Sequence, residues 1–467
     1  MTSPPADGPH PPDPLASLAP LLAELPAGSV IVDSDRMAGY RWDRAGDPAA
    51  GRPLAVLRPA STAEVQAVLR FAAERRLPTV IRGAGTGLSG GSSAVDGCLV
   101  VSTERMRHIE VDPTTRTVVV QPGALNVEVK AAAAAHGLWY PPDPSSFEIC
   151  SIGGNLATNA GGLCCVKYGV TTDYVLGLTV VLADGTVARL GGPRLKDVAG
   201  LSLTKLFVGS EGTLGVITEA ILRLLPAQRP KATVVATFGA LDDAAATVLS
   251  VTRRIRPSML ELMDRGAINA VEDVTAMGLD RTAEAMLVIQ SDEPGPAAAA
   301  EVAEVEALCA GNGAREVFAT DDPEIGEQFV VARRIAIPAV ERRGPLLLED
   351  VGVPLPALGP LIRGIAEIAA RLDVEIAVIA HAGDGNTHPL IVTDRTDPAQ
   401  VARAQLAYGE IMDLAIGLGG TITGEHGVGR LKKPWLADYL GPDVLRLNQR
   451  IKHALDPDGI LNPGVML

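Results

Sequence analysis

The sequence is poor in the residues that build disulfide frameworks and sulfur-ligated clusters. Its 467 residues include five cysteines, none of them in a CxxC pair or an iron–sulfur spacing. A small, odd number of scattered cysteines predicts reduced thiols and excludes a disulfide scaffold. The adjacent Cys164 and Cys165 are not predicted to pair, because a disulfide between neighbouring cysteines is strained.

Long apolar runs and an excess of basic residues are also missing. No stretch reaches the roughly 18 to 20 apolar residues of a membrane span, and the opening MTSPPADGPHPPDP lacks the basic and apolar segments of a signal peptide. The formal charge of −14 repels nucleic-acid phosphates and anionic membrane surfaces. We therefore expect a cytoplasmic protein, at most peripheral to a membrane, that binds no nucleic acid.

The chain is long enough for more than one folded domain, and its hydrophobic content of 47% can build the cores. The proline-rich residues 1–14 predict a disordered tail. From Pro53, strand and helix patterns alternate, as in AVLRP, STAEVQAVLRFAAERR and PTVIRG, and a second alternation begins after Pro226. A linker is predicted over residues 292–300 and a helix over residues 444–454, so the expected fold class is α+β.

A glycine-rich block, IRGAGTGLSGGSS, follows the strand pattern PTVIRG. It lacks the GK[ST] ending of a Walker loop, and Leu88 stands where a dinucleotide fingerprint needs its third glycine. Alone, this block fits a flexible linker as well as a ligand cradle. Two further clusters, SIGGNLATNAGGLCCVKYG and FVGSEGTLGVIT, also combine glycine with Ser, Thr or Asn. Three such loops favour a large polar ligand with a diphosphate and a ring system.

Two of the seven histidines bracket one turn, in HAGDGNTHPLIV. We expect His381 and His388 to face each other across the mouth of a hairpin. Glu425 and His426 follow in TITGEHGVGRLKK. Two imidazoles and one carboxylate suit a catalytic divalent metal with open positions, whereas hydrogen bonding within the loop is the alternative.

Five motifs taken together resemble one family in order and spacing: PTVIRGAGTGLSGG, PPDPSS, IGGNLATNAGG, VGSEGTLGVIT and NPG. The chain resembles FAD-linked oxidases of the vanillyl-alcohol oxidase type from Leu54 to Leu467, in the branch of the glycolate oxidase large subunit, D-lactate dehydrogenase and D-2-hydroxyglutarate dehydrogenase. This resemblance implies a two-subdomain PCMH-type FAD-binding domain over residues 15–228. It also implies a substrate or cap domain over residues 229–433 and a helical segment, residues 434–467, that returns to the FAD site.

The resemblance also implies which residues contact FAD. Thr86 stands where some relatives carry a histidine that attaches FAD covalently, so non-covalent binding is expected. The implied contacts are Arg82, Gly83, Ala84, Gly85, Thr86, Gly87, Leu88, Ser89, Gly90 and Gly91 in the first loop, then Pro142, Asp143, Ser145, Gly153, Gly154, Asn155, Thr158, Asn159 and Gly162, and finally Gly209, Glu211, Gly212, Gly215, Val216, Ile217 and Asn462.

Several members of the same branch use residues that match His381, His388 and Glu425 to hold zinc or manganese beside the substrate. His426 matches the catalytic base, with a role in orienting the metal as the alternative. Arg333, or else Arg334, is expected to anchor the substrate carboxylate, unless both lie on a solvated helix face. Some hydroxyglutarate-oxidising relatives have a basic residue near Leu348, which disfavours a dicarboxylate substrate here.

The expected activity is therefore the FAD-dependent oxidation of a D-2-hydroxy acid, such as D-lactate or glycolate, to the 2-oxo acid. The electron acceptor is a quinone, an electron-transfer flavoprotein, a cytochrome or oxygen, and a homodimer is compatible with the sequence. Three alternatives stay open: a flavin oxidase of another alcohol, a metallohydrolase that uses the His/His/Glu site, and a non-catalytic subunit of a larger oxidase.

Overall fold

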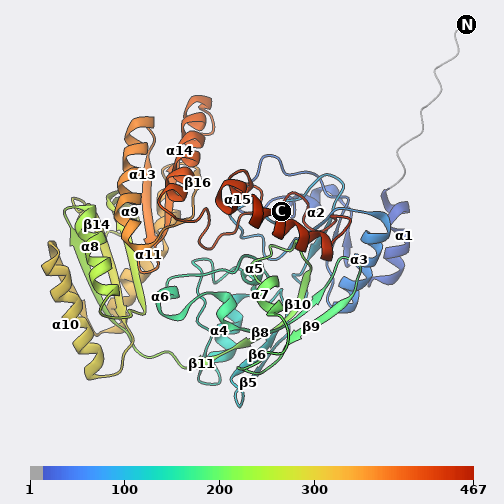
Figure 1. The fold of residues 1–467 in the computed structure, drawn as a ribbon, viewed down its shortest axis with the longest axis horizontal. Helices are drawn as coiled ribbons and strands as arrows, with labels where there is room; N and C mark the ends of the chain where they lie inside the picture. The colour runs from blue at the N-terminus through green and yellow to red at the C-terminus, as the bar shows by residue number, and fades with distance from the viewer. Residues whose placement is uncertain (1–13) are drawn as a thin grey trace, which may run out of the picture.

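The computed structural model describes residues 14–467. The predicted disordered tail therefore lies outside the described residues, apart from the Pro14 that opens helix α1 (Pro14–Glu24). Figure 1 shows two bodies of sheet and helix side by side, and the chain after β11 (Leu225–Pro226) crosses from one to the other. Within residues 14–467, no helix combines the length and apolar composition that a membrane span requires.

The first body begins with a small sheet of order β1-β2-β4-β3, in which β2 and β3 run parallel to β4. Helix α3 (Thr62–Arg75) connects β2 to β3 as the sequence predicts, and Ser61 caps it by accepting a hydrogen bond from the Glu64 amide at 3.2 Å. The strands are β1 (Val30–Ile31), β2 (Ala55–Leu57), β3 (Thr79–Arg82) and β4 (Leu99–Ser102), and α2 spans Ser34–Ala38.

A second, antiparallel sheet of order β5-β6-β10-β8-β9 completes this body. Buried and half-buried residues alternate along β10, as expected for a strand with one face on the core. The strands are β5 (Ile109–Asp112), β6 (Thr117–Val120), β8 (Val175–Val181), β9 (Val187–Gly191) and β10 (Val216–Arg223), while β7 (Leu138–Trp139) pairs with β11. The helices are α4 (Asn126–Ala134), α5 (Ile152–Thr158), α6 (Cys165–Tyr168), η1 (Thr171–Tyr174) and α7 (Leu203–Phe207).

The other body is built on one large sheet of order β15-β12-β14-β13-β18-β19-β16, with β17 also paired to β19. All residues of β14 and β19 are buried, because helices cover both faces. The strands are β12 (Ala232–Phe238), β13 (Met259–Asp264), β14 (Ala285–Ser291), β15 (Ala314–Thr320), β16 (Leu346–Leu348), β17 (Val351–Gly352), β18 (Ile376–His381) and β19 (Asn386–Val392). Helices α8 (Leu241–Thr252), α10 (Pro296–Gly311), α13 (Leu358–Leu372) and α14 (Pro398–Gly417) cover one face, and α9 (Arg265–Thr275), α11 (Pro323–Arg334) and α12 (Ala336–Glu341) the other, with η2 at Leu355–Ala357.

The predicted linker over residues 292–300 is wrong. Helix α10 starts inside it, with Pro296 in the first turn, where proline fits because that turn needs no amide donor. Asp292, which precedes the helix, is buried and accepts a hydrogen bond from Lys167 Nζ at 2.6 Å. The segment therefore joins the two bodies through an ion pair instead of separating flexible parts.

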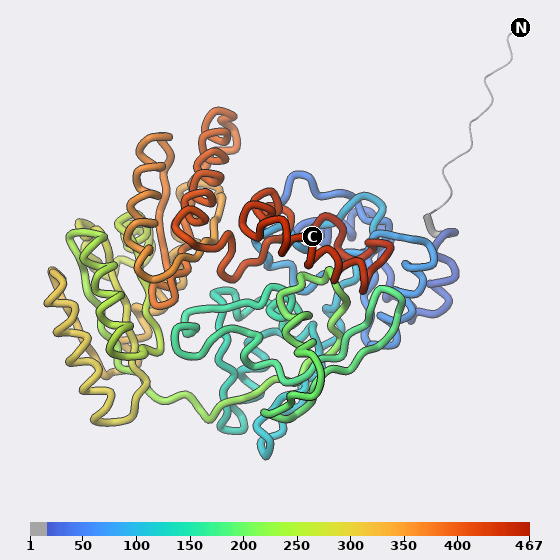
Figure 2. The backbone as a smooth tube through the Cα atoms, viewed as in Figure 1, coloured from blue at the N-terminus to red at the C-terminus, as the bar shows by residue number. Residues whose placement is uncertain are grey.

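The C-terminal segment returns to the first body. Helix α15 (Lys433–Leu455) begins well before the predicted Val444, with a kink at Gly441, where φ is +73°. After it, the Asn462 amide donates to Thr79 O at 2.8 Å, and Asn462 Oδ1 accepts from the Ile81 amide at 2.7 Å. Figure 2 shows this last segment lying against the early part of the chain, which brings Asn462 beside the first glycine loop.

Candidate active site

One cavity of about 400 Å³ is lined by both bodies. The glycine loops form one part of its wall, and the predicted substrate and metal residues form another. Of the site residues predicted from the sequence, those that line the cavity are Gly83, Ala84, Gly85, Thr86, Gly87, Leu88, Ser89, Gly91, Ser145, Gly153, Gly154, Asn155, Thr158, Glu211, Gly212, Gly215, Ile217, Asn462, Arg333, Arg334, His388, Glu425 and His426.

The first glycine loop follows β3 and leaves no room for side chains at two positions. Gly85 has φ +74°, and a Cβ there would lie 2.1 Å from the Arg82 guanidinium. A Cβ at Gly83 would lie 2.5 Å from Ser151 Oγ, which also accepts from the Ala84 amide at 3.2 Å. The loop therefore presents backbone to the cavity, and this suits close approach of a polar cofactor.

Several predicted cofactor residues support the wall from behind instead of lining the cavity. Arg82 donates to Trp42 O at 2.7 Å, and Asn159 Oδ1 accepts from the Thr172 amide at 2.9 Å. Asp143 accepts from the Cys164 amide at 3.2 Å. The residues outside the lining are Arg82, Gly90, Pro142, Asp143, Asn159, Gly162, Gly209 and Val216.

The predicted hairpin is present, but its two histidines are not directly opposite. In the β18–β19 register His388 pairs with Ile379 and His381 pairs with Asn386, so the histidines lie on one face, offset by two positions. Their ring centroids are 5.1 Å apart. Nε2 of His381 lies 3.2 Å from Glu425 Oε1, and Nε2 of His388 lies 3.3 Å from the same oxygen. The strand pairing thus places both imidazoles on one face, where their Nε2 atoms meet the Glu425 carboxylate.

The loop that carries Glu425 and His426 is held by hydrogen bonds that side chains from other segments make to its backbone. Asp350 Oδ2 accepts from Thr423 Oγ1 at 2.6 Å and from the amides of Gly424, Glu425 and His426 at 3.0, 3.1 and 2.9 Å. Ser89 Oγ donates to His426 O at 2.9 Å and Gly427 O at 2.8 Å, and Glu211 accepts from the Val428 and Gly429 amides, each at 2.7 Å. Both bodies therefore hold this loop in place.

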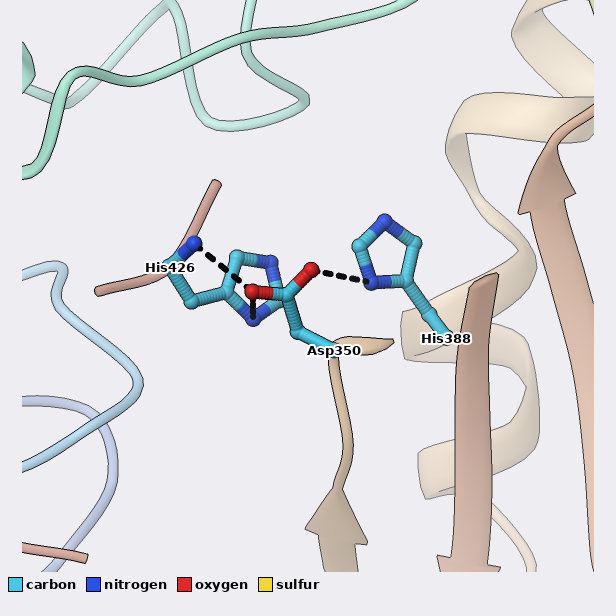
Figure 3. A group of neighbouring side chains, drawn as sticks. All are labelled: Asp350, His388 and His426. Atoms are coloured by element: carbon cyan, nitrogen blue, oxygen red, sulfur yellow. Dashed lines mark hydrogen bonds and ion pairs between the residues drawn. The ribbon is translucent and has the colours of Figure 1, made fainter. Parts of the chain in front are cut away.

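Asp350 also lies between two imidazoles, as Figure 3 shows. Its Oδ1 is 3.7 Å from His388 Nδ1, and its Oδ2 is 4.0 Å from His426 Nδ1. The rings of His388 and His426 stack with centroids 4.8 Å apart. The Nε2 atoms of both rings point away from Asp350, toward Glu425.

Burial sets the protonation of the two loop residues. It lowers the pKa of His426 to about 4, despite the opposing charge of Asp350. His426 is therefore neutral near pH 7, as a general base must be. Burial alone would raise the pKa of the Glu425 carboxyl, but His381 and His388 outweigh it and hold that pKa well below its usual range. Glu425 is therefore ionised.

These side chains could hold a divalent cation. The possible ligand atoms form two groups, and within each group they lie within 4.8 Å of one another. The groups are His381/His388/Glu425 and Asp350/His388/His426. The first group fits better, because two imidazole Nε2 atoms and an ionised carboxylate converge, whereas Asp350 Oδ2 is already occupied by four donors. His381 does not line this first cavity but a second one of about 530 Å³, and Glu425 faces both.

The two arginines end α11, and both line the first cavity, which the glycine loops also line. Arg333 is 1% exposed, so the alternative of a solvated helix face is wrong for it. Its Nη2 lies 2.8 Å from Glu261 Oε2, yet Nε and Nη2 make no hydrogen bond with any acceptor among residues 14–467. Arg334 pairs with Asp143 at 2.9 Å and lies over the Phe147 ring.

Sequence reasoning missed the two buried carboxylates behind the histidines, Glu261 and Asp350. Glu261 accepts a hydrogen bond from His381 Nδ1 at 2.8 Å. A signal for each was present, because a charged residue inside an apolar strand pattern, as in MLELMD and LLLED, needs a buried partner. What the sequence alone does not show is which partner lies across the sheet.

Comparison with protein families gives two matches that together cover most of the chain. Residues 53–191 match the FAD binding domain, and residues 227–466 match the C-terminal domain of FAD linked oxidases. The chain belongs to the FAD-linked oxidases. It is an FAD-linked oxidoreductase acting on CH–OH groups, as the sequence predicted. The FAD-binding match favours this class over the metallohydrolase alternative.

Two curated relatives of this FAD-linked oxidase align with nearly its whole length. It is 43% identical over 417 residues to the glycolate oxidase subunit GlcD of Bacillus subtilis, covering 89% of each chain. It is 35% identical over 433 residues to a D-lactate dehydrogenase of Archaeoglobus fulgidus, covering 91% of this chain and 94% of the relative.

Solved structures show the same fold. p-Cresol methylhydroxylase superposes with a TM-score of 0.79 at 18% identity, covering 96% of each chain. The 4-ethylphenol oxidase of Gulosibacter chungangensis gives a TM-score of 0.78 at 20% identity, with the same coverage. The predicted PCMH-type α+β fold is therefore confirmed.

Proposed function

We propose that this FAD-linked oxidase converts a D-2-hydroxy acid of the size of D-lactate or glycolate to the 2-oxo acid. The observation that carries the proposal is the shared cavity, whose wall includes the glycine loops as well as Arg333, His388, Glu425 and His426. The names of the two curated relatives support the substrate class.

FAD supplies the acceptor for the hydride that leaves C2. The glycine-loop residues named from the sequence would hold it, and Thr86 in the lining supports non-covalent attachment. We also propose that the residues matching the family's FAD contacts bind FAD in this chain, and that its domains meet near residues 228 and 433.

Arg333 is the proposed anchor of the substrate carboxylate. Its Nε and Nη2 are buried and make no hydrogen bond with the described residues, although Nη2 forms an ion pair with Glu261 Oε2 at 2.8 Å, so a carboxylate in the cavity would satisfy donors that are otherwise costly to bury. Arg334, held by Asp143 and Phe147, lies beside it and adds positive charge.

His381, His388 and Glu425 would hold a divalent metal, zinc or manganese, which as a Lewis acid would lower the pKa of the substrate's 2-hydroxyl. His426 then removes the hydroxyl proton through Nε2. Three features suit it to this role: it is neutral, it lines the cavity, and Asp350 and Ser89 hold its backbone. General-base help of this kind contributes about 10² to 10⁴ in rate.

The cap side of the cavity favours a small monocarboxylate. Ile337, Pro338 and Ile379 form an apolar wall beside the arginines. Leu348, where some relatives carry a basic residue, pairs with Leu390 in the sheet and packs in an apolar cluster. A second carboxylate on the substrate would therefore lose water without gaining a partner at this wall.

A substrate panel tests the proposal. The purified, flavin-loaded protein is assayed with D-lactate, L-lactate, glycolate and D-2-hydroxyglutarate, with a dye as electron acceptor. We expect turnover of D-lactate or glycolate, and a kcat/KM for D-2-hydroxyglutarate lower by about 100-fold or more. Preference for the dicarboxylate would contradict the assignment of the apolar wall, and absence of turnover on all four acids would contradict the substrate class.

A further inference from the structure

A single buried carboxylate connects the proposed metal ligand His381 to the proposed substrate anchor Arg333. Glu261 is 1% exposed. Its Oε1 lies 2.8 Å from His381 Nδ1, and its Oε2 lies 3.0 Å from the same nitrogen and 2.8 Å from Arg333 Nη2. One carboxylate group therefore contacts both functional side chains.

The sheet fixes Glu261 in this place. It lies on β13, which pairs with β18 through Leu262↔Ala380 and Met263↔Ile379, so it is held close to the end of the strand that carries His381. Its neighbours on the same face, Met259 and Met263, belong to an apolar cluster. An ionised carboxylate in such surroundings is costly unless charged partners satisfy it.

The hydrogen bond to Glu261 also determines which nitrogen of His381 carries a proton. A carboxylate can only accept, so the proton must sit on Nδ1. Nε2 is then the ring nitrogen that a metal would bind, and it points toward Glu425, the third proposed ligand, 3.2 Å away.

His388 has a carboxylate at the same ring position, but with a different linkage. Asp350 lies 3.7 Å from His388 Nδ1 and is otherwise bound to the loop that carries Glu425 and His426. Among the carboxylates of this cluster, Glu261 is the one that contacts an arginine of the cavity wall.

We infer that Glu261 is a positioning residue that couples metal binding at His381 to the placement of Arg333 for the substrate carboxylate. This inference rests on the proposed function. It goes beyond it because one change at Glu261, which does not line the substrate cavity, is expected to weaken two separate binding events.

The test is Glu261→Gln. A glutamine carries no charge and replaces one carboxylate oxygen with an NH2 group, so either His381 Nδ1–H or the Arg333 guanidinium faces a donor instead of an acceptor. If its amide group donates to Nδ1 instead, His381 must carry its proton on Nε2 and cannot bind a metal. We expect zinc affinity of the metal-free flavoprotein, measured by competition with a chromophoric chelator, to fall by about 10- to 100-fold. In zinc-saturated protein we expect KM for D-lactate to rise by about tenfold or more.

The matched control is Asp264→Asn on the same strand. Asp264 caps α9 by accepting from the Ala267 amide at 2.8 Å, and its side chain points into that helix end. Asparagine caps a helix about as well as aspartate, so zinc affinity and KM should stay within twofold of the wild type. Glu261→Asp provides a second variant that keeps the charge but is one methylene too short to reach both partners, and we expect the same two losses.

Three outcomes decide the inference. The inference is supported if a Glu261 variant that retains its flavin has both a weaker zinc affinity and a higher KM, while Asp264→Asn has neither change. Zinc affinity and KM unchanged in Glu261→Gln, or in Glu261→Asp if the first variant does not fold, overturn it and leave the proposed function standing. A wild-type protein that binds no metal, or oxidises no hydroxy acid, overturns the proposed function and this inference together.

Discussion

His426 illustrates how a residue type predicted from a motif acquires its chemistry from burial. The EHG motif indicates a candidate base, but a free histidine titrates near pH 6.5. Here burial lowers the pKa of His426 to about 4, with Asp350 opposing it and the stacked His388 adding to it. The neutral ring, with Nε2 toward Glu425, follows from packing that no local pattern encodes.

The acid limb of the pH profile should reflect this shift. Protonation of His426 removes its function as a base, so kcat/KM is lost as pH falls through the pKa of the folded protein. Because that pKa is lowered to about 4, we expect kcat/KM to be flat from about pH 5 upward and to fall near pH 4. His426→Gln should lower kcat by about 10² to 10⁴ and remove this limb.

The flavin absorbance of His426→Gln gives the control, because the variant should bind FAD as the wild type does. A wild-type acid limb near pH 6.5, or a His426→Gln enzyme with turnover within a few-fold of the wild type, would show that His426 is not the base.

Buried carboxylates mark the limit of sequence reasoning at this scale. The resemblance gives His381, His388, Glu425 and His426 because they stand in recognisable motifs. Glu261 and Asp350 stand in strand-like runs, and their roles depend on pairings with segments far away in the sequence, such as Asp350 with residues 423–426. Such partners are known only when the sheet order is known.

At the scale of elements, the loop of residues 423–429 depends on three anchors from different segments, Asp350, Ser89 and Glu211. Asp350 matters most, because one of its oxygens accepts four hydrogen bonds while the buried Lys432 lies 3.6 Å away. Replacing the Asp350 carboxylate with an amide removes a negative charge beside Lys432. The amide also has a single acceptor oxygen and a donor NH2 group, so the four hydrogen bonds to the loop are not all retained.

Asp350→Asn should therefore cost about 3 kcal/mol in the free energy of unfolding. Urea unfolding followed by circular dichroism measures this change. Asp373→Asn serves as the control, because the Asp373 side chain is 98% exposed at a left-handed helix end, where asparagine is equally acceptable. A variant at Asp350 as stable as the control would mean that the loop is held by other contacts.

Local sequence patterns predicted some helices and strands correctly and others wrongly. Helix α3 follows from the pattern STAEVQAVLRFAAERR, in which the capping Ser61 acts locally. The start of α10 was missed because PGPAAAA has the composition of a linker, although proline is favourable in the first turn of a helix. The offset of His381 and His388 was missed because register depends on where β19 begins, at Asn386.

At the scale of the whole molecule, the candidate site exists only where the two bodies meet. The glycine loops come from the first, the histidines and arginines from the second, and the C-terminal segment reaches the cavity at Asn462. How the two bodies are placed against each other cannot be derived from the sequence alone. The order of five motifs nevertheless predicted the family and fold, because those motifs mark the backbone positions that a flavin site requires.

The most direct measurement is anaerobic reduction of the bound flavin by D-lactate, followed by visible absorbance, before and after thorough chelation of the purified protein. We expect D-lactate to bleach the flavin of the untreated protein, chelation to slow this reduction by about 100-fold or more, and zinc or manganese to restore it. Bleaching at an unchanged rate after metal removal would contradict the role assigned to His381, His388 and Glu425, and a protein that D-lactate and glycolate both fail to bleach would contradict the proposed function itself.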